Sequence, residues 1–292
     1  MNKCFITKLP SSVDNDNLPV LGQLRINWLK QSDLTDNDAR AIGLSTNDSI
    51  TIKVSGAHLT DSTLASNLGN TKTITVADGL VWLYVSNDAD AILTIDNKYS
   101  LTYLSFGRLE KYNLKCSVKF DINDIRYCTA LNYLNLSRTS VSGDISAVSQ
   151  LTNLRSIALN YTQVSGKIDS LANITGLDYI AELKGLSLTG DMSKIPAGVR
   201  FISQAGRKVN TNFTWTAKGR QNATLLAIDE NIPFDTASMD NMFIDQATCT
   251  FKPTDGWSRI ISVKGTRTSA SDDAVTAIQN MGVTITGVTK QD

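Results

Sequence analysis

The sequence lacks the side chains from which most catalytic and metal sites are built. His58 is the only histidine in 292 residues, and no motif near it supplies a nucleophile with an orienting acid. We therefore expect His58 at the surface or at a strand edge. Neither a P-loop nor a G-x-G-x-x-G fingerprint occurs. The sequence predicts that this is not an enzyme and that it uses no cofactor and no metal.

Three Asp-x-Asp pairs carry the carboxylates that calcium prefers, but they lack the glycine and the distal glutamate of an EF-hand loop. They are Asp14 with Asp16, Asp36 with Asp38, and Asp88 with Asp90. Short Asp/Asn runs are typical of turns and helix caps, and we predict that role here.

The cysteines are few and scattered. Cys4, Cys116, Cys128 and Cys249 form no C-x-x-C pair, which argues against a zinc site and against a disulfide framework. We predict free thiols, most of them buried.

Net charge and long apolar runs are also missing. Lys plus Arg and Asp plus Glu both number 28, and there is no dense basic run, so nucleic acid is disfavoured as a partner. No run of 18 apolar residues occurs, so we predict no membrane span. The first residues, MNKCFITKLPSSVDNDN, contain only the brief apolar stretch CFI, and we predict no secretory signal peptide.

A repeat dominates the middle of the chain. Residues 131–153 (LNYLNLSRTSVSGDISAVSQLTN) align with residues 154–176 (LRSIALNYTQVSGKIDSLANITG), and every apolar column is kept. A third copy covers 177–198 if one residue is inserted after Ile180. The strand of an earlier copy is LTYLSF at 101–106, followed by a longer loop. The sequence therefore predicts about four stacked coils with a 23-residue period, because one coil alone buries too little apolar surface to fold.

The L-x-x-L-x-L pattern of these coils resembles leucine-rich repeats. In that family the position of Thr139 and Thr162 is usually an Asn that bonds the neighbouring turn, so this sequence departs from the pattern. A Thr hydroxyl is expected to make a weaker, local bond. We associate this variation with repeats of gut bacteria and their phages.

Regular elements are also predicted on both sides of the repeats. Before the repeats we expect strands at 49–54, 71–76, 80–85 and 91–95, which form an amino-terminal β cap that continues the sheet. After them we expect strands at 224–228, 259–263 and 283–287 and helices at 237–249 and 270–282, the second ending at Gly282.

The predicted fold class is a β-rich α/β solenoid of leucine-rich repeats with a β amino-terminal cap and strand-helix carboxy-terminal caps. Its parts are an attachment or oligomerisation segment (1–45), a β-rich cap (46–100), the repeats (101–198) and the capping repeats (199–292).

The solvent-facing positions of the repeat strands are the candidate binding face, because Tyr and Arg are common at interface hot spots. At the repeat period, Tyr133, Ser156 and Tyr179 fall in one column. The candidate residues are Tyr133, Asn135, Arg138, Arg155, Tyr161, Tyr179 and Glu182. The alternative is that these side chains only solvate a sheet.

The opening MNKCFITKLPSSVDNDNLPVLGQLRI resembles a short amino-terminal module on virion proteins of crAss-like tailed phages that infect Bacteroides. The resemblance implies a head fibre or capsid decoration that assembles in the host cytoplasm. It also implies attachment to capsid or other virion proteins through the amino terminus, a dimer or trimer, and contact with a host-surface glycan or protein.

Two alternatives remain open. One is a surface or secreted leucine-rich-repeat adhesin of a bacterium, which needs an export signal. The other, less favoured, is a tail-associated glycan-degrading protein, which needs a pair of acids lining a groove.

Overall fold

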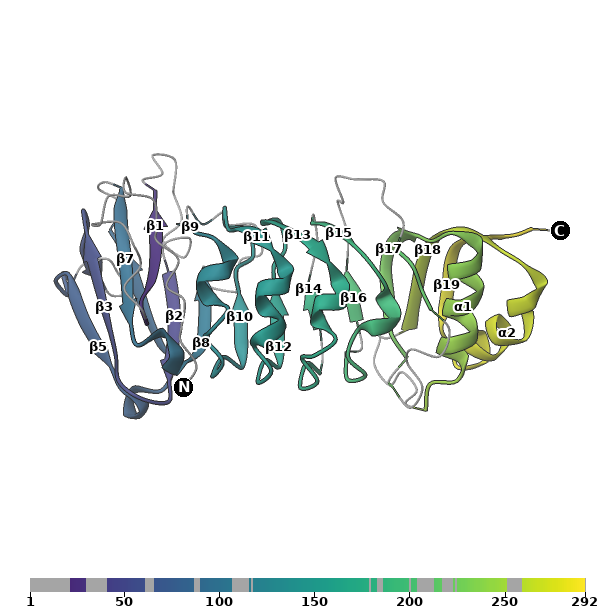
Figure 1. The fold of residues 1–292 in the computed structure, drawn as a ribbon, viewed down its shortest axis with the longest axis horizontal. Coiled ribbons are helices and arrows are strands. Elements are labelled where there is room, and N and C mark those ends of the chain that lie inside the picture. The colour runs from purple at the N-terminus through teal and green to yellow at the C-terminus, as the bar shows by residue number, and fades with distance from the viewer. Residues whose placement is uncertain are drawn as a thin grey trace, which may run out of the picture.

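The computed structural model is an elongated body, with the purple and blue sheets at one end and the yellow strand and helix at the other (Figure 1). The structure describes residues 22–29, 41–60, 66–86, 90–106, 116, 118–178, 180–182, 186–199, 201–203, 213–216, 223, 225–250 and 259–291.

One sheet of eleven strands runs the length of these residues and is called the long sheet. In spatial order its strands are β4 (Leu59–Thr60), β6 (Val81–Val85), β2 (Ala41–Thr46), β8 (Leu101–Phe106), β10 (Tyr133–Asn135), β12 (Ser156–Ala158), β14 (Ile180–Glu182), β16 (Phe201–Ser203), β17 (Ala227–Pro233), β18 (Ile260–Arg267) and β19 (Thr284–Lys290). The strands from β4 to β8 pair antiparallel, and every pair from β8 to β19 is parallel. The strand β8 is therefore where an antiparallel sheet becomes a repeat sheet.

A second sheet of five antiparallel strands packs against the amino-terminal end of the long sheet. Its strands are β5 (Thr71–Ile74), β3 (Ile50–Ser55), β7 (Ala91–Asp96), β1 (Leu24–Trp28) and β9 (Val118–Lys119). Burial alternates along β3 and β7, as expected for strands with one face on a core. Two short 3-10 helices, η3 (Val76–Asp78) and η4 (Lys98–Ser100), connect this region.

The amino-terminal part is therefore a two-layer sandwich, which differs from the predicted cap. All four predicted strands exist, but only β6 continues the long sheet, while β3, β5 and β7 form the second layer. The strands β1 and β2 also belong to the sandwich, so the predicted boundary at residue 45 falls inside β2. Alternation identifies a strand with one buried face, but it does not say which sheet that strand joins.

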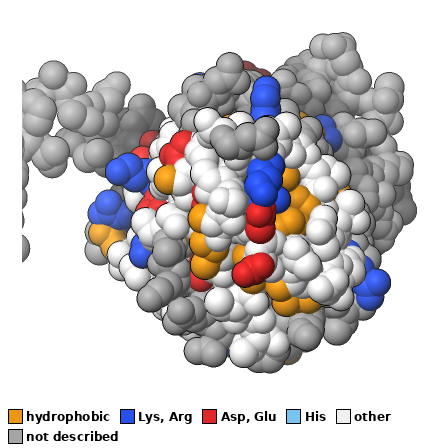
Figure 2. All heavy atoms as spheres, turned by 90° about the vertical axis from the view of Figure 1, so that its right-hand side faces the viewer, with side chains coloured by type: hydrophobic (Ala, Val, Ile, Leu, Met, Phe, Trp, Pro, Cys, Tyr) orange, Lys and Arg blue, Asp and Glu red, His pale blue; other side chains and the backbone are white. Residues whose placement is uncertain are grey.

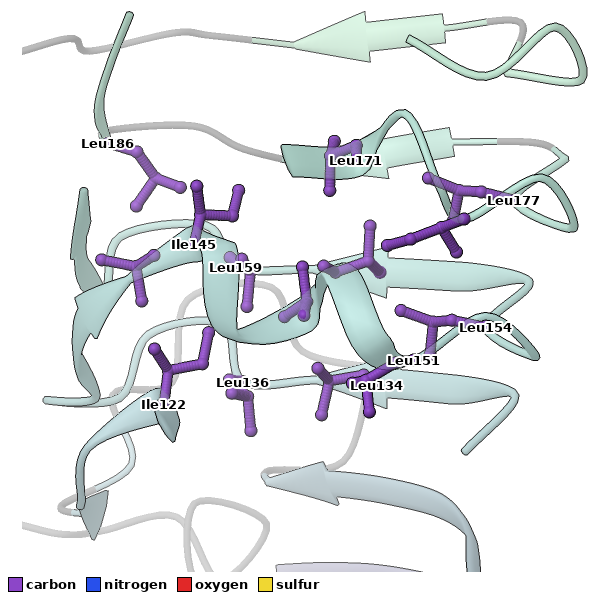
Figure 3. Packing of buried hydrophobic residues seen from close by; sticks show 14 of the residues in the cluster. Ile122, Leu134, Leu136, Ile145, Leu151, Leu154, Leu159, Leu171, Leu177 and Leu186 are labelled. Carbon is purple, nitrogen blue, oxygen red and sulfur yellow. The ribbon is translucent and has the colours of Figure 1, made fainter. Parts of the chain in front are cut away.

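Beyond β8 the chain winds into coils of a repeat solenoid-like fold. Each coil adds a strand to the long sheet, turns into a strand of a short parallel sheet, and returns through a 3-10 helix. The short sheet contains β11 (Ser142–Asp144), β13 (Gln163–Lys167) and β15 (Ser187–Thr189), and the 3-10 helices are η5 (Ile122–Ile125), η6 (Ile145–Gln150), η7 (Ile168–Leu171) and η8 (Met192–Lys194). Leucine and isoleucine side chains of successive coils stack between these three sides (Figure 3).

The spacing between coils is not constant. Tyr133 lies opposite Ser156, 23 residues later, but Tyr103 lies opposite Tyr133, 30 residues later. Ile157 lies opposite Ala181, 24 residues later, whereas the predicted column placed Ile180 there. The extra residue therefore precedes Ile180 and does not follow it. A one-residue slip moves a side chain to the other face of a strand, so the predicted place of the insertion, and with it the column position of Ile180, was wrong.

Thr139 and Thr162 hold the same position in successive coils, and each forms a hydrogen bond within its own turn, as expected. The hydroxyl of Thr139 donates to the Leu136 carbonyl at 2.7 Å, and that of Thr162 donates to the Leu159 carbonyl at 2.9 Å. Both threonines are buried, so these bonds satisfy carbonyls that water does not reach.

Glycines within or directly after the strands of the short sheet lie against carboxylates of the preceding coil. The φ angle of Gly166 is +114°, and a Cβ there would lie 2.8 Å from both carboxylate oxygens of Asp144. The same Asp144 carboxylate accepts a hydrogen bond from the Ser146 amide and so starts η6. Because glycine has no side chain, β13 can approach the aspartate that caps the 3-10 helix of the preceding coil.

We expect Gly166→Ala to destabilise the protein by about 1–3 kcal/mol, because the substitution adds backbone strain and a clash with Asp144. Denaturant unfolding would measure the change. Gly176→Ala is the matched control in the same coil, since φ there is not left-handed and the nearest atom lies at an ordinary 3.5 Å. Equal loss of stability in both variants would contradict this account.

The carboxy-terminal part alternates strands and helices as predicted. The helices are α1 (Thr236–Ala247) and α2 (Asp272–Asn280), the latter preceded by the 3-10 helix η10 (Ser269–Ser271), and Gly282 follows with φ of +81°. The strand β17 begins three residues later than the predicted 224, and β18 and β19 extend beyond their predicted ends. The buried carboxylate of Asp240 joins α1 to η10 by accepting hydrogen bonds from Thr268 and Ser271.

The carboxy-terminal end of the body mixes apolar and charged side chains, with acidic and basic groups side by side through its middle (Figure 2). Asp272 accepts from Arg267 at 2.5 Å and from Lys290 at 2.6 Å, which ties α2 to β18 and β19. Hydrogen bonds from Lys290 and then Arg267 hold the pKa of Asp272 below its usual value.

Asp191 joins the last of the described coils to the segment around Thr216. Its carboxylate accepts from the amides of Ser193 and Thr216 at 2.9 and 3.2 Å and from the Thr216 hydroxyl at 2.7 Å. Burial raises the pKa of Asp191, but the bonds from Ser193 and Thr216 together outweigh burial and lower it below its usual value.

A carboxyl whose pKa is lower in the folded state than in the unfolded state contributes stability above the unfolded-state pKa and loses it as the pH falls. We therefore expect Asp191→Asn to lower the free energy of unfolding at pH 7 and to weaken its decline between about pH 5 and pH 2. Denaturant unfolding at several pH values would measure both effects. A constant difference between the two proteins across that range would contradict the assignment.

Candidate binding surface

The described residues contain no group of three or more His, Cys, Asp or Glu side chains that could hold a metal ion. His58 is half-buried directly before β4, where its backbone exchanges hydrogen bonds with Ser86. Cys116, Cys128 and Cys249 are buried free thiols, as predicted, and burial raises the pKa of Cys116 and of Cys128 to about 12. Cys4 and five of the six Asp-x-Asp carboxylates lie outside the described residues.

No helix in the described part of the chain is both long and apolar enough to span a membrane.

Three aromatic side chains form a line on the outer face of the long sheet, two from the paired strands β8 and β10 and one from β6, which β2 separates from β8. They are Trp82 of β6, Tyr103 of β8 and Tyr133 of β10, here called the aromatic row. The strand register sets Tyr103 opposite Tyr133, and their rings stack with centroids 4.3 Å apart and an interplanar angle of 3°. The Trp82 and Tyr103 rings meet edge to face, at 6.4 Å and 76°. All three side chains are half-buried.

The position of Trp82 depends on a glycine in the strand between β6 and β8. Gly43 of β2 lies opposite both Trp82 and Ser105. A Cβ on Gly43 would lie 2.8–2.9 Å from three carbons of the six-membered ring of Trp82. The indole therefore lies face down on the backbone of β2, and only glycine leaves room for it.

The side chains next to the row are polar and uncharged. The hydroxyls of Ser45 and Thr102 bond each other at 2.7 Å. Ser105 shares the outer face of β8 with Tyr103 because side chains alternate along a strand. It is fully buried, and its Oγ makes no hydrogen bond of normal geometry, although it interacts with the Tyr103 side chain. Burial raises the pKa of Tyr103, and interactions with the side chains of Ser105 and Tyr133 oppose this shift only in part.

A second contact lies in the turns that follow β10 and β12. The guanidinium of Arg138 lies over the Tyr161 ring, 4.5 Å from its centroid. Both residues occupy the left-handed region, with φ of 59° and 56°, and they hold corresponding positions in successive coils. Left-handed backbone is strained for such side chains, so the coil geometry imposes this pairing. Tyr161 is 44% exposed.

The structure places some of the predicted binding residues in contact with other aromatic or basic side chains, and it shows that one of them, Asn135, is buried. Tyr133 belongs to the aromatic row, and Arg138 contacts Tyr161. Arg155 is exposed in the turn before β12. Asn135 was wrongly predicted to face solvent: it is 3% exposed, and its Oδ1 accepts from the Ser137 amide at 3.0 Å.

The remaining predicted residues lie in the third coil. Tyr179 is outside the described residues, and of Glu182 only the backbone is described, opposite Ala158 in β12. The predicted column of Tyr133, Ser156 and Tyr179 fails at its last member, because the register of β14 is shifted by one residue.

Trp82 and Tyr103 were not predicted as binding residues, because both precede the 23-residue copies at 131–153 and 154–176. A signal for Tyr103 is present, since LTYL at 101–104 matches LNYL at 131–134 and aligns Tyr103 with Tyr133. Nothing in the sequence places Trp82 beside them, because that contact depends on the pairing of β6 with β2.

Comparison with known proteins identifies no family. No family model matches the chain, and no curated protein matches it. Among solved structures, a TDR receptor aligns with a TM-score of 0.40 and 14% identity over 61% of this chain and 29% of the receptor chain. The leucine-rich-repeat ectodomain of the plant receptor kinase GASSHO1/SCHENGEN3 from Arabidopsis thaliana aligns with a TM-score of 0.34 and 16% identity. The alignment covers 51% of this chain and 17% of the ectodomain chain.

An internalin from Listeria monocytogenes also aligns, with a TM-score of 0.18 and 11% identity over 65% of this chain and 82% of its own. The chain thus spans less than a third of the TDR receptor chain and of the GASSHO1/SCHENGEN3 ectodomain. Similarity at this level carries no functional argument, and the function is argued from the residues.

Proposed function

We propose that this protein is a non-enzymatic binding component of a phage virion, a head fibre or capsid decoration. In this proposal the aromatic row presents a binding surface to the host. The observation that carries the binding role is the row itself. Half-buried aromatic rings at the outer face of a rigid sheet lose little conformational entropy when they contact a partner, which makes them effective anchors.

The virion location rests on the resemblance of residues 1–26 to an amino-terminal module of crAss-like phage proteins. In the proposal the amino-terminal segment attaches to capsid or other virion proteins and forms a dimer or trimer. The repeats and the carboxy-terminal caps then extend away from the particle, because the body is elongated, the repeats follow the sandwich and the caps lie at the opposite end (Figure 1).

We expect the double variant Trp82→Ala, Tyr133→Ala to bind Bacteroides cells at least about tenfold more weakly than the unchanged protein, because two anchors of the row are removed. Quantitative cell-binding assays with labelled protein would measure the effect. Tyr127→Ala is the control, since Tyr127 is 49% exposed and lies next to η5, away from the row. Equal binding by all three proteins would contradict the binding role of the row.

We expect mass spectrometry of purified particles to detect the protein at a copy number that is constant between preparations. Recovery of the protein from a bacterial envelope fraction, together with its absence from particles, would contradict the virion location and favour the adhesin alternative.

A further inference from the structure

Two aromatic faces of the row meet at a corner. The Trp82 indole lies with one face on Gly43, so its other face points away from the sheet. The Tyr103 ring stands at 76° to the indole and is backed on its far side by the stacked ring of Tyr133. A ligand at this corner would contact one flat ring from above and one upright ring from the side.

The chemistry around the corner is neutral and rich in hydrogen-bonding groups. The neighbouring outer-face positions on β2, β8, β10 and β12 carry no charge. Ser45 and Ser156 supply half-buried hydroxyls, Ser105 and Asn135 are buried, and Gly43 and Ala158 have no polar side chain. An ionic ligand would lose its hydration here without gaining a counter-charge. A neutral polyhydroxyl ligand would lose less and would find partners for its hydroxyl groups.

One of these groups is poorly paired within the protein. The Oγ of Ser105 is buried and interacts with the Tyr103 side chain, but it makes no hydrogen bond of normal geometry. Its residue lies opposite Gly43 on one side and Asn135 on the other. A poorly paired buried hydroxyl destabilises a fold, and such groups are concentrated at functional sites.

From these observations we infer that the aromatic row is a saccharide-binding site for neutral sugars. The apolar C–H face of a pyranose ring stacks on the Trp82 indole, because polarised C–H groups are attracted to the electron-rich face of an aromatic ring. Tyr103 and Tyr133 bound the sugar laterally. The buried Ser105 hydroxyl interacts with the Tyr103 side chain and so helps to position that ring. The inference deepens the proposed function and rests on it.

The test uses the full-length protein and defined neutral polysaccharides, namely a β-glucan, an α-mannan and an arabinogalactan, with hyaluronan and polygalacturonate as charged polymers. Affinity gel electrophoresis and isothermal titration calorimetry would measure binding. We expect binding to at least one neutral polymer and to neither charged one. Tyr133→Ala should weaken that binding roughly three- to tenfold, as loss of one aromatic contact predicts, and Tyr127→Ala should leave it unchanged.

Ser105→Ala is the sharper variant because its two effects have opposite signs. Removing a poorly paired buried hydroxyl should leave the unfolding midpoint unchanged or raised. The same variant should bind the neutral polymer several-fold more weakly, because the Tyr103 ring loses the side chain that helps to position it. A Ser105→Ala protein that is equally stable and binds as tightly as the unchanged protein would overturn the role of Ser105.

The outcomes also separate this inference from the proposed function. If Trp82→Ala, Tyr133→Ala abolishes cell binding while no neutral polymer binds, the row has a different ligand, such as a proline-rich peptide, and only the saccharide inference is overturned. If cell binding does not depend on the row, both are overturned.

Discussion

Backbone hydrogen bonding between strands, carried without a break along the long axis, is the constraint on which the rest of this structure depends. The strand β8 makes it continuous, because it pairs antiparallel with β2 on one side and parallel with β10 on the other. The second layer continues in the same way, since β9 pairs with β1 and a bridge from Asp121 to Ser142 leads into the short sheet. Each sheet of the sandwich thus continues into one side of the coils. The buried apolar residues of the sandwich and of the coils form one cluster.

Much of this could be predicted from the sequence, because the repeats encode their own contacts. A residue in one coil meets its counterpart in the next, so the apolar columns, the local bonds of Thr139 and Thr162, and the strand at 101–106 follow from periodicity. The helices near 237 and 272 follow from local patterns in the same way. Periodicity fails where the coil length changes, and a single inserted residue near Ile180 was enough to misplace a column.

The binding surface was harder to predict than the fold because its parts come from different kinds of structure. Tyr133 belongs to the repeats, Tyr103 to the strand where repeats begin, and Trp82 to the sandwich. Their association depends on strand pairing and on the missing side chain of Gly43, neither of which leaves a periodic signal. Alternation along a strand indicates which face a residue occupies, but not whether neighbours cover it, and so Asn135 was misjudged.

The direction of the strands also determines how the molecule would respond to tension. In Figure 1 the strands of the coils lie across the long axis, so a force that separates the two ends acts along the hydrogen bonds that join neighbouring strands. Such loading opens one strand pair at a time, whereas a force along the strands would shear many bonds together. The body would lengthen stepwise, one coil after another, and recover as each coil packs again. A protein held at one end and attached at the other to a moving surface would then act as an extensible tether and not as a rigid rod.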